Sequence, residues 1–76
     1  MYSNVSENTI NLVKNKIQAL KIKLKKQINS KGYSENMGQK EKRDIEDFIN
    51  KEVGFNTTSE MLMNQLQDVF YELNLE

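Results

Sequence analysis

The segment INLVKNKIQALKIKLKKQI, residues 10–28, carries the longest regular pattern in the chain. Its large apolar residues recur at alternating intervals of three and four, the spacing of the a and d positions of a heptad repeat. This heptad seam consists of Ile10, Val13, Ile17, Leu20, Leu24 and Ile28. Ser6 is a favourable N-cap, and the sequence Asn-Ser-Lys-Gly at 29–32 favours a helix end. The pattern therefore predicts a helix over about residues 6–29.

The predicted helix is long for the size of the chain. At ~1.5 Å per residue it measures about 36 Å, whereas a compact globule of 76 residues has a diameter of roughly 30 Å. A domain of this size buries only about 60% of the surface of its unfolded chain, so its core is small. We therefore expect one elongated all-α domain over residues 1–76, a helical hairpin or three-helix bundle stabilised by helix packing or by a partner such as a second copy.

The stretch SKGYSENMGQKEKR, residues 30–43, separates this helix from the next apolar pattern. Its glycines and polar residues predict a turn over 30–36. Asn36 as N-cap with Gln39 as capping-box partner, and Gly54 just past the end, predict a second helix over about 37–53, antiparallel to the first. The narrow apolar face of this helix consists of Ile45, Phe48, Ile49 and Val53.

A third helix is predicted over about residues 58–73. The sequence TTSE at 57–60 is typical of a capping box, made by Thr57 and Glu60. We expect Phe55, just before this box, to pack against the first turn of the helix.

Two of the three predicted helices are apolar on two sides. On the first helix, Leu12, Ala19 and Ile22 lie opposite the heptad seam. The third helix has one stripe of Leu62, Leu66, Val69 and Leu73, and a second of Met61, Phe70, Tyr71 and Leu75. Three helices can hardly bury both second faces, so we expect one of them to meet a second copy or another molecule. The alternative is that the second faces only widen the core.

Large and adaptable side chains are the types favoured at protein interfaces. The predicted partner-binding residues are Tyr33, Met37, Met61, Phe70 and Tyr71. For Tyr33 and Met37, which lie in the turn region, the alternative is that they cover the end of the core.

Several kinds of chemistry are excluded by composition. The chain has no cysteine and no histidine, so it cannot form disulfides, thiolate or imidazole metal sites, or Cys/His and Ser/His catalytic pairs. The acidic sequence RDIEDF at 43–48 is typical of a solvated helix face, with Lys40–Asp44 and Asp47–Lys51 pairs at i, i+4. The alternative is a divalent metal on Asp44 and Asp47. We predict a non-enzymatic protein without metal or cofactor.

Charge divides the chain into two arms. Residues 1–40 carry eight lysines against two acidic residues, and residues 41–76 carry three basic residues against nine acidic ones. The lysine run KIKLKKQINSK, residues 21–31, can pair with the acidic arm, which favours internal neutralisation. The alternative is phosphate binding by a nucleic-acid accessory factor. Its predicted contacts are Lys21, Lys23, Lys25 and Lys26.

The sequence gives no sign of a membrane protein. No apolar run approaches the ~18 to 20 residues that span a bilayer, and the start MYSNVSENT lacks the basic and apolar regions of a signal peptide. An interfacial amphipathic helix is the third interpretation of the lysine run, but the first helix has no aromatic anchor. We expect a cytoplasmic protein without membrane contact. Its many Asn, Lys and Ile residues suit AT-rich coding DNA, and thus a low-GC bacterial host or its phages.

The segment GYSENMGQKEKRDIED, residues 32–47, resembles part of small proteins encoded by phages and prophages of low-GC Gram-positive bacteria. These share a G-x-x-E-N-x-G-Q-K-E-x-R pattern after a long basic helix. The matching positions are Gly32, Glu35, Asn36, Gly38, Gln39, Lys40, Glu41, Arg43, Ile45, Glu46 and Asp47. The resemblance implies a phage-type accessory protein and no particular activity.

A second likeness concerns layout. The small aspartyl-phosphate phosphatases of bacilli are antiparallel helical hairpins with a Lys-Gly turn, which is similar to the Lys31-Gly32 turn, and a Ser-Gln-Glu-Leu-Asp motif on the second helix. That motif falls on Lys42, Arg43, Asp44, Ile45 and Glu46, where only the apolar residue is kept. The likeness implies a shared hairpin and a degenerate response-regulator phosphatase.

The predicted function is that of a small non-enzymatic regulator or inhibitor, encoded by a phage or prophage, that docks on a host or defence protein, for example a CRISPR nuclease. A homodimer is compatible with this function. The nucleic-acid accessory factor is the first alternative, and the degenerate phosphatase is the second.

Overall fold

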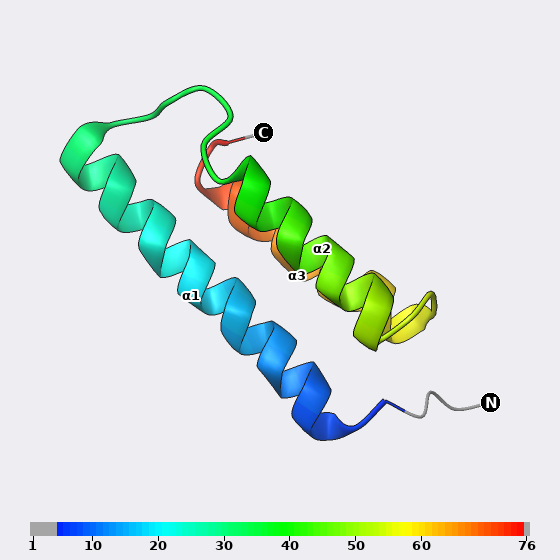
Figure 1. Cartoon of the computed structure of the whole chain (residues 1–76). Helices are drawn as coiled ribbons and strands as arrows, with labels where there is room; N and C mark the ends of the chain where they lie inside the picture. The colour runs from blue at the N-terminus through cyan, green and yellow to red at the C-terminus, as the bar shows by residue number, and fades with distance from the viewer. Residues whose placement is uncertain (1–4, 76) are drawn as a thin grey trace.

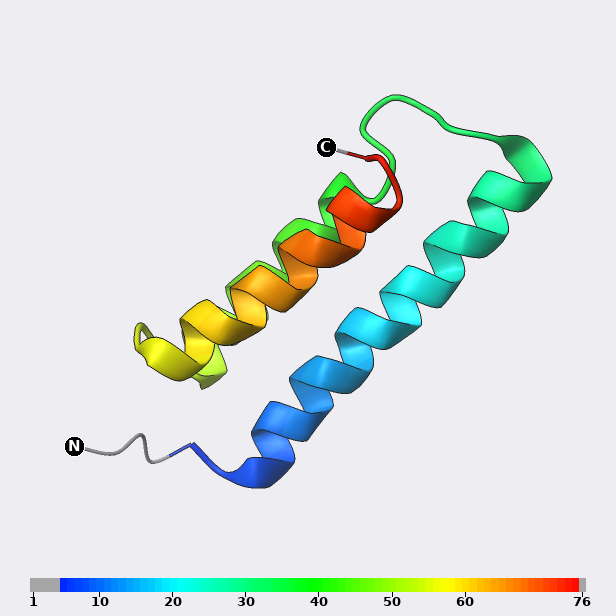
Figure 2. The ribbon, with the colours of Figure 1, turned by 180° about the vertical axis from the view of Figure 1, so that it is seen from behind.

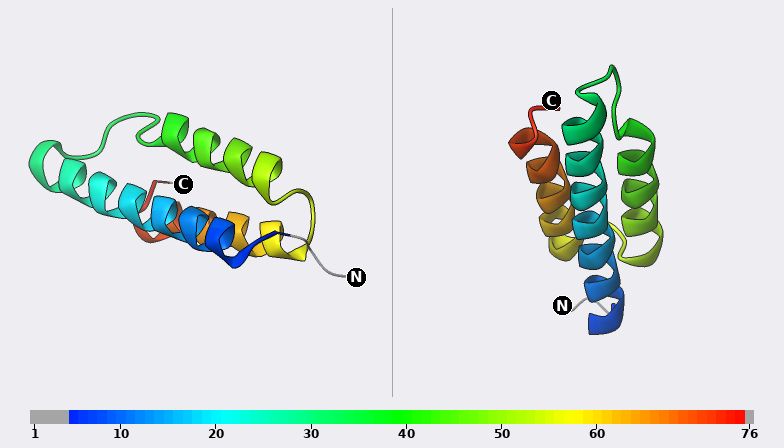
Figure 3. Two further views of the ribbon diagram at one scale, coloured as in Figure 1. Left: turned by 60° about the horizontal axis from the view of Figure 1, so that its bottom comes forward. Right: turned by 90° about the vertical axis from the view of Figure 1, so that its left-hand side faces the viewer.

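Three helices form an elongated bundle in a computed structural model that describes residues 5–75. They are α1 (Glu7–Lys31), α2 (Gln39–Glu52) and α3 (Thr57–Glu72), and each runs antiparallel to the one before it (Figure 1). The molecule measures 45 × 19 × 17 Å. Seen from behind, α3 runs parallel to α1, and a view from the side shows the three helices next to one another (Figures 2 and 3). The prediction of an all-α three-helix bundle is confirmed, and the observed helix bounds lie within two residues of the predicted ones.

The heptad seam of α1 forms its buried face. Val13, Ile17, Leu20 and Leu24 are buried, and Ile10 is half-buried against the core. The helix begins where Ser6 accepts a hydrogen bond from the Thr9 amide at 3.2 Å, as expected of an N-cap. It ends at Gly32, which has a left-handed φ of 80° and donates its amide to the Ile28 carbonyl.

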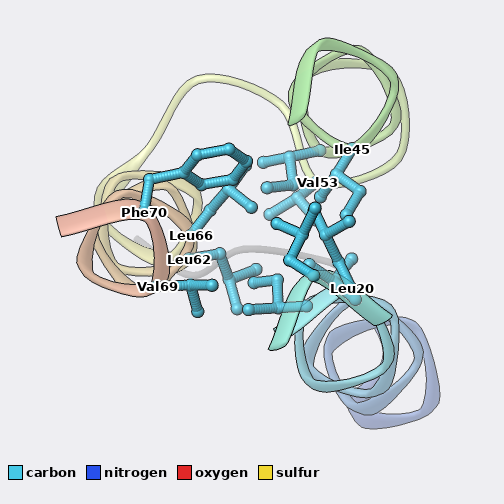
Figure 4. Close-up of a cluster of buried hydrophobic side chains, with 11 residues drawn as sticks. Leu20, Ile45, Val53, Leu62, Leu66, Val69 and Phe70 are labelled. Atoms are coloured by element: carbon cyan, nitrogen blue, oxygen red, sulfur yellow. The ribbon is translucent and has the colours of Figure 1, made fainter. Parts of the chain in front are cut away.

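All three helices contribute to one hydrophobic core, in which side chains from α1, α2 and α3 point toward a common centre (Figure 4). Phe70, Leu62 and Leu66 from α3 are fully buried there. Each fully buried side chain of this kind contributes about 1.5–3 kcal/mol relative to leaving it exposed. The core residues are Val13, Ile17, Leu20, Leu24, Ile45, Ile49, Val53, Leu62, Leu66, Val69 and Phe70.

The connection from α1 to α2 ends on a glycine that the core requires. Gly38 has a φ of 76°, and a Cβ atom added to it would lie 3.0 Å from side-chain atoms of both Leu24 and Phe70. Only glycine fits both the backbone angle and the space. The prediction that Asn36 caps a helix starting at 37 is therefore wrong. The helix begins at Gln39, and Asn36 accepts the Gln39 amide at 3.1 Å through its backbone carbonyl.

The turn from α2 to α3 is short and firmly capped. Gly54, with a φ of 93°, follows the last residues of α2 as predicted. The capping box lies one residue earlier than expected, because Asn56 is the N-cap and Ser59 its partner, while Thr57 is the first helical residue. The Ser59 amide donates to Asn56 Oδ1 at 2.9 Å, and the Asn56 amide donates to Ser59 Oγ at 2.8 Å.

The C-terminal end of α3 closes with a Schellman motif. Asn74 adopts a left-handed φ of 60° and donates its amide to the Tyr71 carbonyl at 3.1 Å. The Leu75 amide donates to the Phe70 carbonyl at 2.8 Å, and the Leu75 side chain packs against the core. This motif turns the chain back so that the end of α3 is covered.

Candidate partner-binding surface

The α2–α3 turn presents an aromatic ring to solvent. Phe55 is 88% exposed, so the prediction that it packs against the first turn of α3 is wrong. Two nearby residues fix the backbone on either side of it. Val53 is buried in the core, and Asn56 is held both by the capping box and by a hydrogen bond from its Nδ2 to the Val53 carbonyl at 2.8 Å. The ring is exposed because the backbone on either side of it is committed to ending one helix and starting the next.

An open hollow of about 640 Å³ lies beside this ring. We call it the Phe55 hollow; its lining residues are Asn50, Phe55, Asn56, Thr57, Ser59, Glu60, Met63 and Asn64. Met63 is half-buried and packs against the core, while Asn50, Asn64 and Glu60 supply amide and carboxylate groups. Aromatic residues and methionine are enriched at protein interfaces, so the Phe55 hollow is the candidate partner-binding surface.

The predicted partner-binding residues do not form one surface. Tyr33, Met61 and Tyr71 are exposed, but Met37 is half-buried against the core. Phe70 is fully buried, so its assignment to an exposed surface is wrong; it lies next to Leu24 and Gly38 inside the bundle.

Distance also separates the exposed members of this set. Met61 and Tyr71 are ten residues apart on α3, or about 15 Å along the helix. Tyr33 lies in the connection at the opposite end of the bundle from Phe55. Sequence reasoning missed Phe55 because helical periodicity says nothing about a residue between helices. The available signal was its place between Gly54 and a cap, where no helical face can cover it.

Two of the four lysines predicted to bind nucleic acid are engaged within the bundle. Lys21 pairs with Glu72 of α3 at 2.8 Å, and Lys23 pairs with Glu41 of α2 at 3.1 Å. Within residues 5–75, no ion pair involves Lys25 or Lys26, and both are exposed. The packing thus neutralises part of the basic run and leaves its C-terminal part open.

The two glutamates in these ion pairs, Glu41 and Glu72, both have a lowered side-chain pKa. The pKa of Glu41 is lowered by a hydrogen bond from its own backbone amide in the first turn of α2, and further by its bond with Lys23. The pKa of Glu72 is lowered by its hydrogen bond with Lys21 and by the charge of that lysine. A lysine of α1 is the main cause of the Glu72 pKa shift and a secondary cause of the Glu41 pKa shift.

The acidic face of α2 resembles a solvated surface. Lys40 pairs with Asp44 at 3.6 Å as predicted, and both side chains are largely exposed. The predicted Asp47–Lys51 pair is not formed in the part of the chain that the structure covers. Ile45, the position that matches the phosphatase motif, is buried in the core. Among the described residues there is no cluster of three or more acidic side chains that could hold a metal ion.

No helix in the described range 5–75 is long and apolar enough to span a membrane. Comparisons of the chain with protein-family models, with curated proteins and with solved structures find no match.

Proposed function

We propose that this protein is a small non-enzymatic regulator or inhibitor that docks on another protein through the Phe55 hollow. The observation that carries the proposal is the 88% exposure of Phe55, a side chain that is held in place by a capped turn beside an open hollow. A host or defence protein, such as a CRISPR nuclease, is the concrete form of partner that we would test first.

Energetics support the proposal. Leaving a phenylalanine in water forgoes about 1.5–3 kcal/mol that burial would supply, which is a large amount for a bundle with a core of eleven apolar side chains. A partner that covers the ring would recover this free energy on binding. Because the turn is fixed by four hydrogen bonds between Val53, Asn56 and Ser59, little conformational freedom is lost in the process.

The chemistry of the hollow defines the partner segment. Its centre accepts an apolar or aromatic side chain between Phe55 and Met63. Asn50 and Asn64 can exchange hydrogen bonds with a peptide backbone, and Glu60 favours a lysine or arginine at the edge. We therefore expect a protein surface with an exposed apolar anchor and a basic neighbour.

A photo-crosslinking amino acid at position 55 tests the proposal in the host cell. We expect it to capture one protein in excess over the same amino acid at Tyr71, which is 75% exposed but lies at the other end of α3. Affinity of that protein for the Phe55→Ala variant should fall at least tenfold, while Tyr71→Ala should bind like the unchanged chain. Equal capture from both positions, or equal affinity of both variants, would overturn the proposal.

One observation favours nucleic-acid binding as a second candidate function. The last turns of α1, which carry Lys25, Lys26 and Lys31, extend past the start of α2 and the end of α3 (Figure 1), and Tyr33 is exposed in the connection that follows. If they bind phosphates, affinity for a single-stranded oligonucleotide should fall steeply with salt, and Lys25→Gln with Lys26→Gln should abolish it. Lys14→Gln with Lys51→Gln, an equal loss of charge away from the C-terminal end of α1, is the control. No binding at low salt would exclude this function.

A further inference from the structure

The outer side of α1 carries a second heptad pattern. Positions that alternate by four and three run along this side from residue 8 to residue 29, and all of them are exposed. We call them the outer stripe; its members are Asn8, Leu12, Asn15, Ala19, Ile22, Lys26 and Asn29. Neither α2 nor α3 covers it, and Leu12 and Ile22 remain 46% and 53% exposed.

We infer that the outer stripe binds the same stripe of a second copy of this chain, with the two α1 helices antiparallel. In an antiparallel coiled coil, each a position faces a d position of the partner helix. One register places Leu12 opposite Ile22 of the second copy, and by symmetry Ile22 opposite Leu12. The same register sets Asn15 opposite Ala19 and Asn8 opposite Lys26.

Other arrangements match the stripe less well. A shift by one heptad in one direction sets Leu12 against Asn29, and in the other direction against Asn15. A parallel pair would stack Lys26 on Lys26 and asparagine on asparagine along the stripe. Among the antiparallel registers, only the one that joins Leu12 to Ile22 removes both large aliphatic side chains from water. A parallel pair would also cover them, by placing Leu12 on Leu12 and Ile22 on Ile22, but it would bring the lysines of the two copies together.

Charge favours the same orientation. The C-terminal part of α1, residues 21–31, carries five lysines, whereas residues 7–20 carry two lysines and Glu7. Antiparallel pairing keeps the two lysine-rich parts apart, and parallel pairing would bring them together. Lys16 lies over the Phe48 ring at 5.0 Å and Lys23 pairs with Glu41, so the lysines that border the stripe toward α2 already have partners.

The contact surface extends beyond α1. Ala19 of the stripe also borders a shallow groove between α1 and α2, with a volume of about 290 Å³. Leu20 and Ile45 contribute to its lining, which is mostly apolar. Because alanine is small, the second helix can approach closely at this point and place side chains over the groove. The stripe itself spans about 32 Å, but only its two Leu–Ile layers are strongly apolar. We therefore expect a reversible dimer whose population depends on concentration.

The inferred dimer does not depend on the proposed function, and it leaves both Phe55 hollows accessible to a partner. In the antiparallel arrangement the two Phe55 hollows lie at opposite ends of the pair, because the α2–α3 turn is next to the start of α1. Each copy would bind its own partner molecule without hindrance from the other.

Disulfide trapping tests the register directly, since the chain has no cysteine of its own. Leu12→Cys and Ile22→Cys are made as two separate proteins, then oxidised alone and as an equal mixture. We expect covalent dimers mainly in the mixture, because position 12 faces position 22 but lies about 15 Å along the helix from its own copy. Dimers of Leu12→Cys alone at the same yield, or no dimers in the mixture, would overturn the inference.

Sedimentation equilibrium of variants that contain no cysteine provides the second test. The molar mass of the unchanged chain should rise from 8.9 kDa toward twice that value with concentration. Ile22→Asp should stay at the monomer mass, and Met61→Asp, which changes an equally exposed residue of α3, should dimerise like the unchanged chain. Circular dichroism establishes that each variant is folded. A monomer at all concentrations up to about 1 mM, or an equal effect of both variants, would contradict the inference.

Discussion

The two connections of this bundle differ in how their side chains and backbone pack. The α1–α2 connection packs on the core, and the α2–α3 turn exposes its aromatic side chain to solvent. The α1–α2 connection, residues 32–38, folds back onto the core: a Cβ atom added to Gly38 would lie 3.0 Å from Leu24 and Phe70, and Met37 is half-buried. The α2–α3 turn, residues 53–56, is shorter and more tightly hydrogen-bonded, yet it leaves Phe55 in water.

The difference indicates that the first connection serves packing of the core, and that the second serves capping of α3. The first is shaped by what the core can accommodate, so its substitutions should cost stability. The second is shaped by the cap that starts α3, and under the proposed function the side chain that it exposes contacts a partner. Stability and binding should therefore respond to different residues.

The largest expected effect is that of Phe70→Ala in the core. Removing a fully buried phenylalanine from a small bundle should lower the free energy of unfolding by about 3–5 kcal/mol, because a cavity is left between α1, α2 and α3. Tyr71→Ala, at the next position but 75% exposed, should change it by less than about 0.5 kcal/mol. Urea denaturation followed by circular dichroism measures both. Similar losses for the two variants would contradict the assignment of Phe70 to the core.

Glycine-to-alanine substitutions compare the two connections directly. Gly38→Ala adds a methyl group 3.0 Å from Leu24 and Phe70 at a left-handed φ, and should cost about 2–4 kcal/mol. Gly54→Ala has a similar φ but no contact closer than 3.6 Å, so only the backbone cost of about 1–2 kcal/mol applies. Thermal unfolding of both variants gives the difference. If Gly54→Ala were the more harmful change, the α1–α2 connection would not be the one packed on the core.

Capping of α3 should depend on Asn56. Asn56→Ala removes the side-chain acceptor of the Ser59 amide and the bond to the Val53 carbonyl, and should cost about 1 kcal/mol. Thr57→Ala changes the neighbouring residue that the sequence pattern favours as the cap, and should be nearly neutral, because Thr57 is already inside the helix. The midpoints of urea denaturation distinguish the two variants. A larger loss of stability for Thr57→Ala than for Asn56→Ala would show that Thr57 is the N-cap and would contradict the Asn56–Ser59 box.

Acid should weaken the links between α1 and the other helices slightly. Because the folded-state pKa values of Glu41 and Glu72 lie below the ordinary value of 4.5, their contribution is present above that pH and is lost as pH falls through the lowered values. The Glu41–Lys23 pair is partly exposed, so its share is below about 1 kcal/mol. Glu41→Gln should flatten the fall in unfolding free energy from about pH 6 to about pH 3. An unchanged slope would exclude this pair as a source of stability.

Periodicity predicted the helices well because it reports the buried face. The heptad seam placed four of the buried residues of α1, and the stripe of Leu62, Leu66 and Val69 placed three of α3. The second stripe of α3 was less informative. Phe70 lies only about 40° around the helix from Leu66 and turns into the core, whereas Tyr71 lies a further ~100° away and stays exposed.

The connections could not be predicted in the same way. Capping rules favour Asn36 and Thr57, but the left-handed Gly38 and the Asn56–Ser59 box are selected by how the chain meets Leu24 and Val53. The contact of the Gly38 region with Leu24 and Phe70 exists only after the helices have packed, whereas the Asn56–Ser59 box is local to the turn. The place of Phe55 between Gly54 and this cap was a signal in the sequence, but helical periodicity does not report it.

The most direct test of the account is the free energy of unfolding of Phe55→Ala. Because the ring is displayed by the α2–α3 turn and not used by the core, we predict a change of less than about 0.5 kcal/mol in urea denaturation. A loss of about 2 kcal/mol or more would show that Phe55 packs against the bundle, and would contradict both the comparison of the two connections and the binding site built on it.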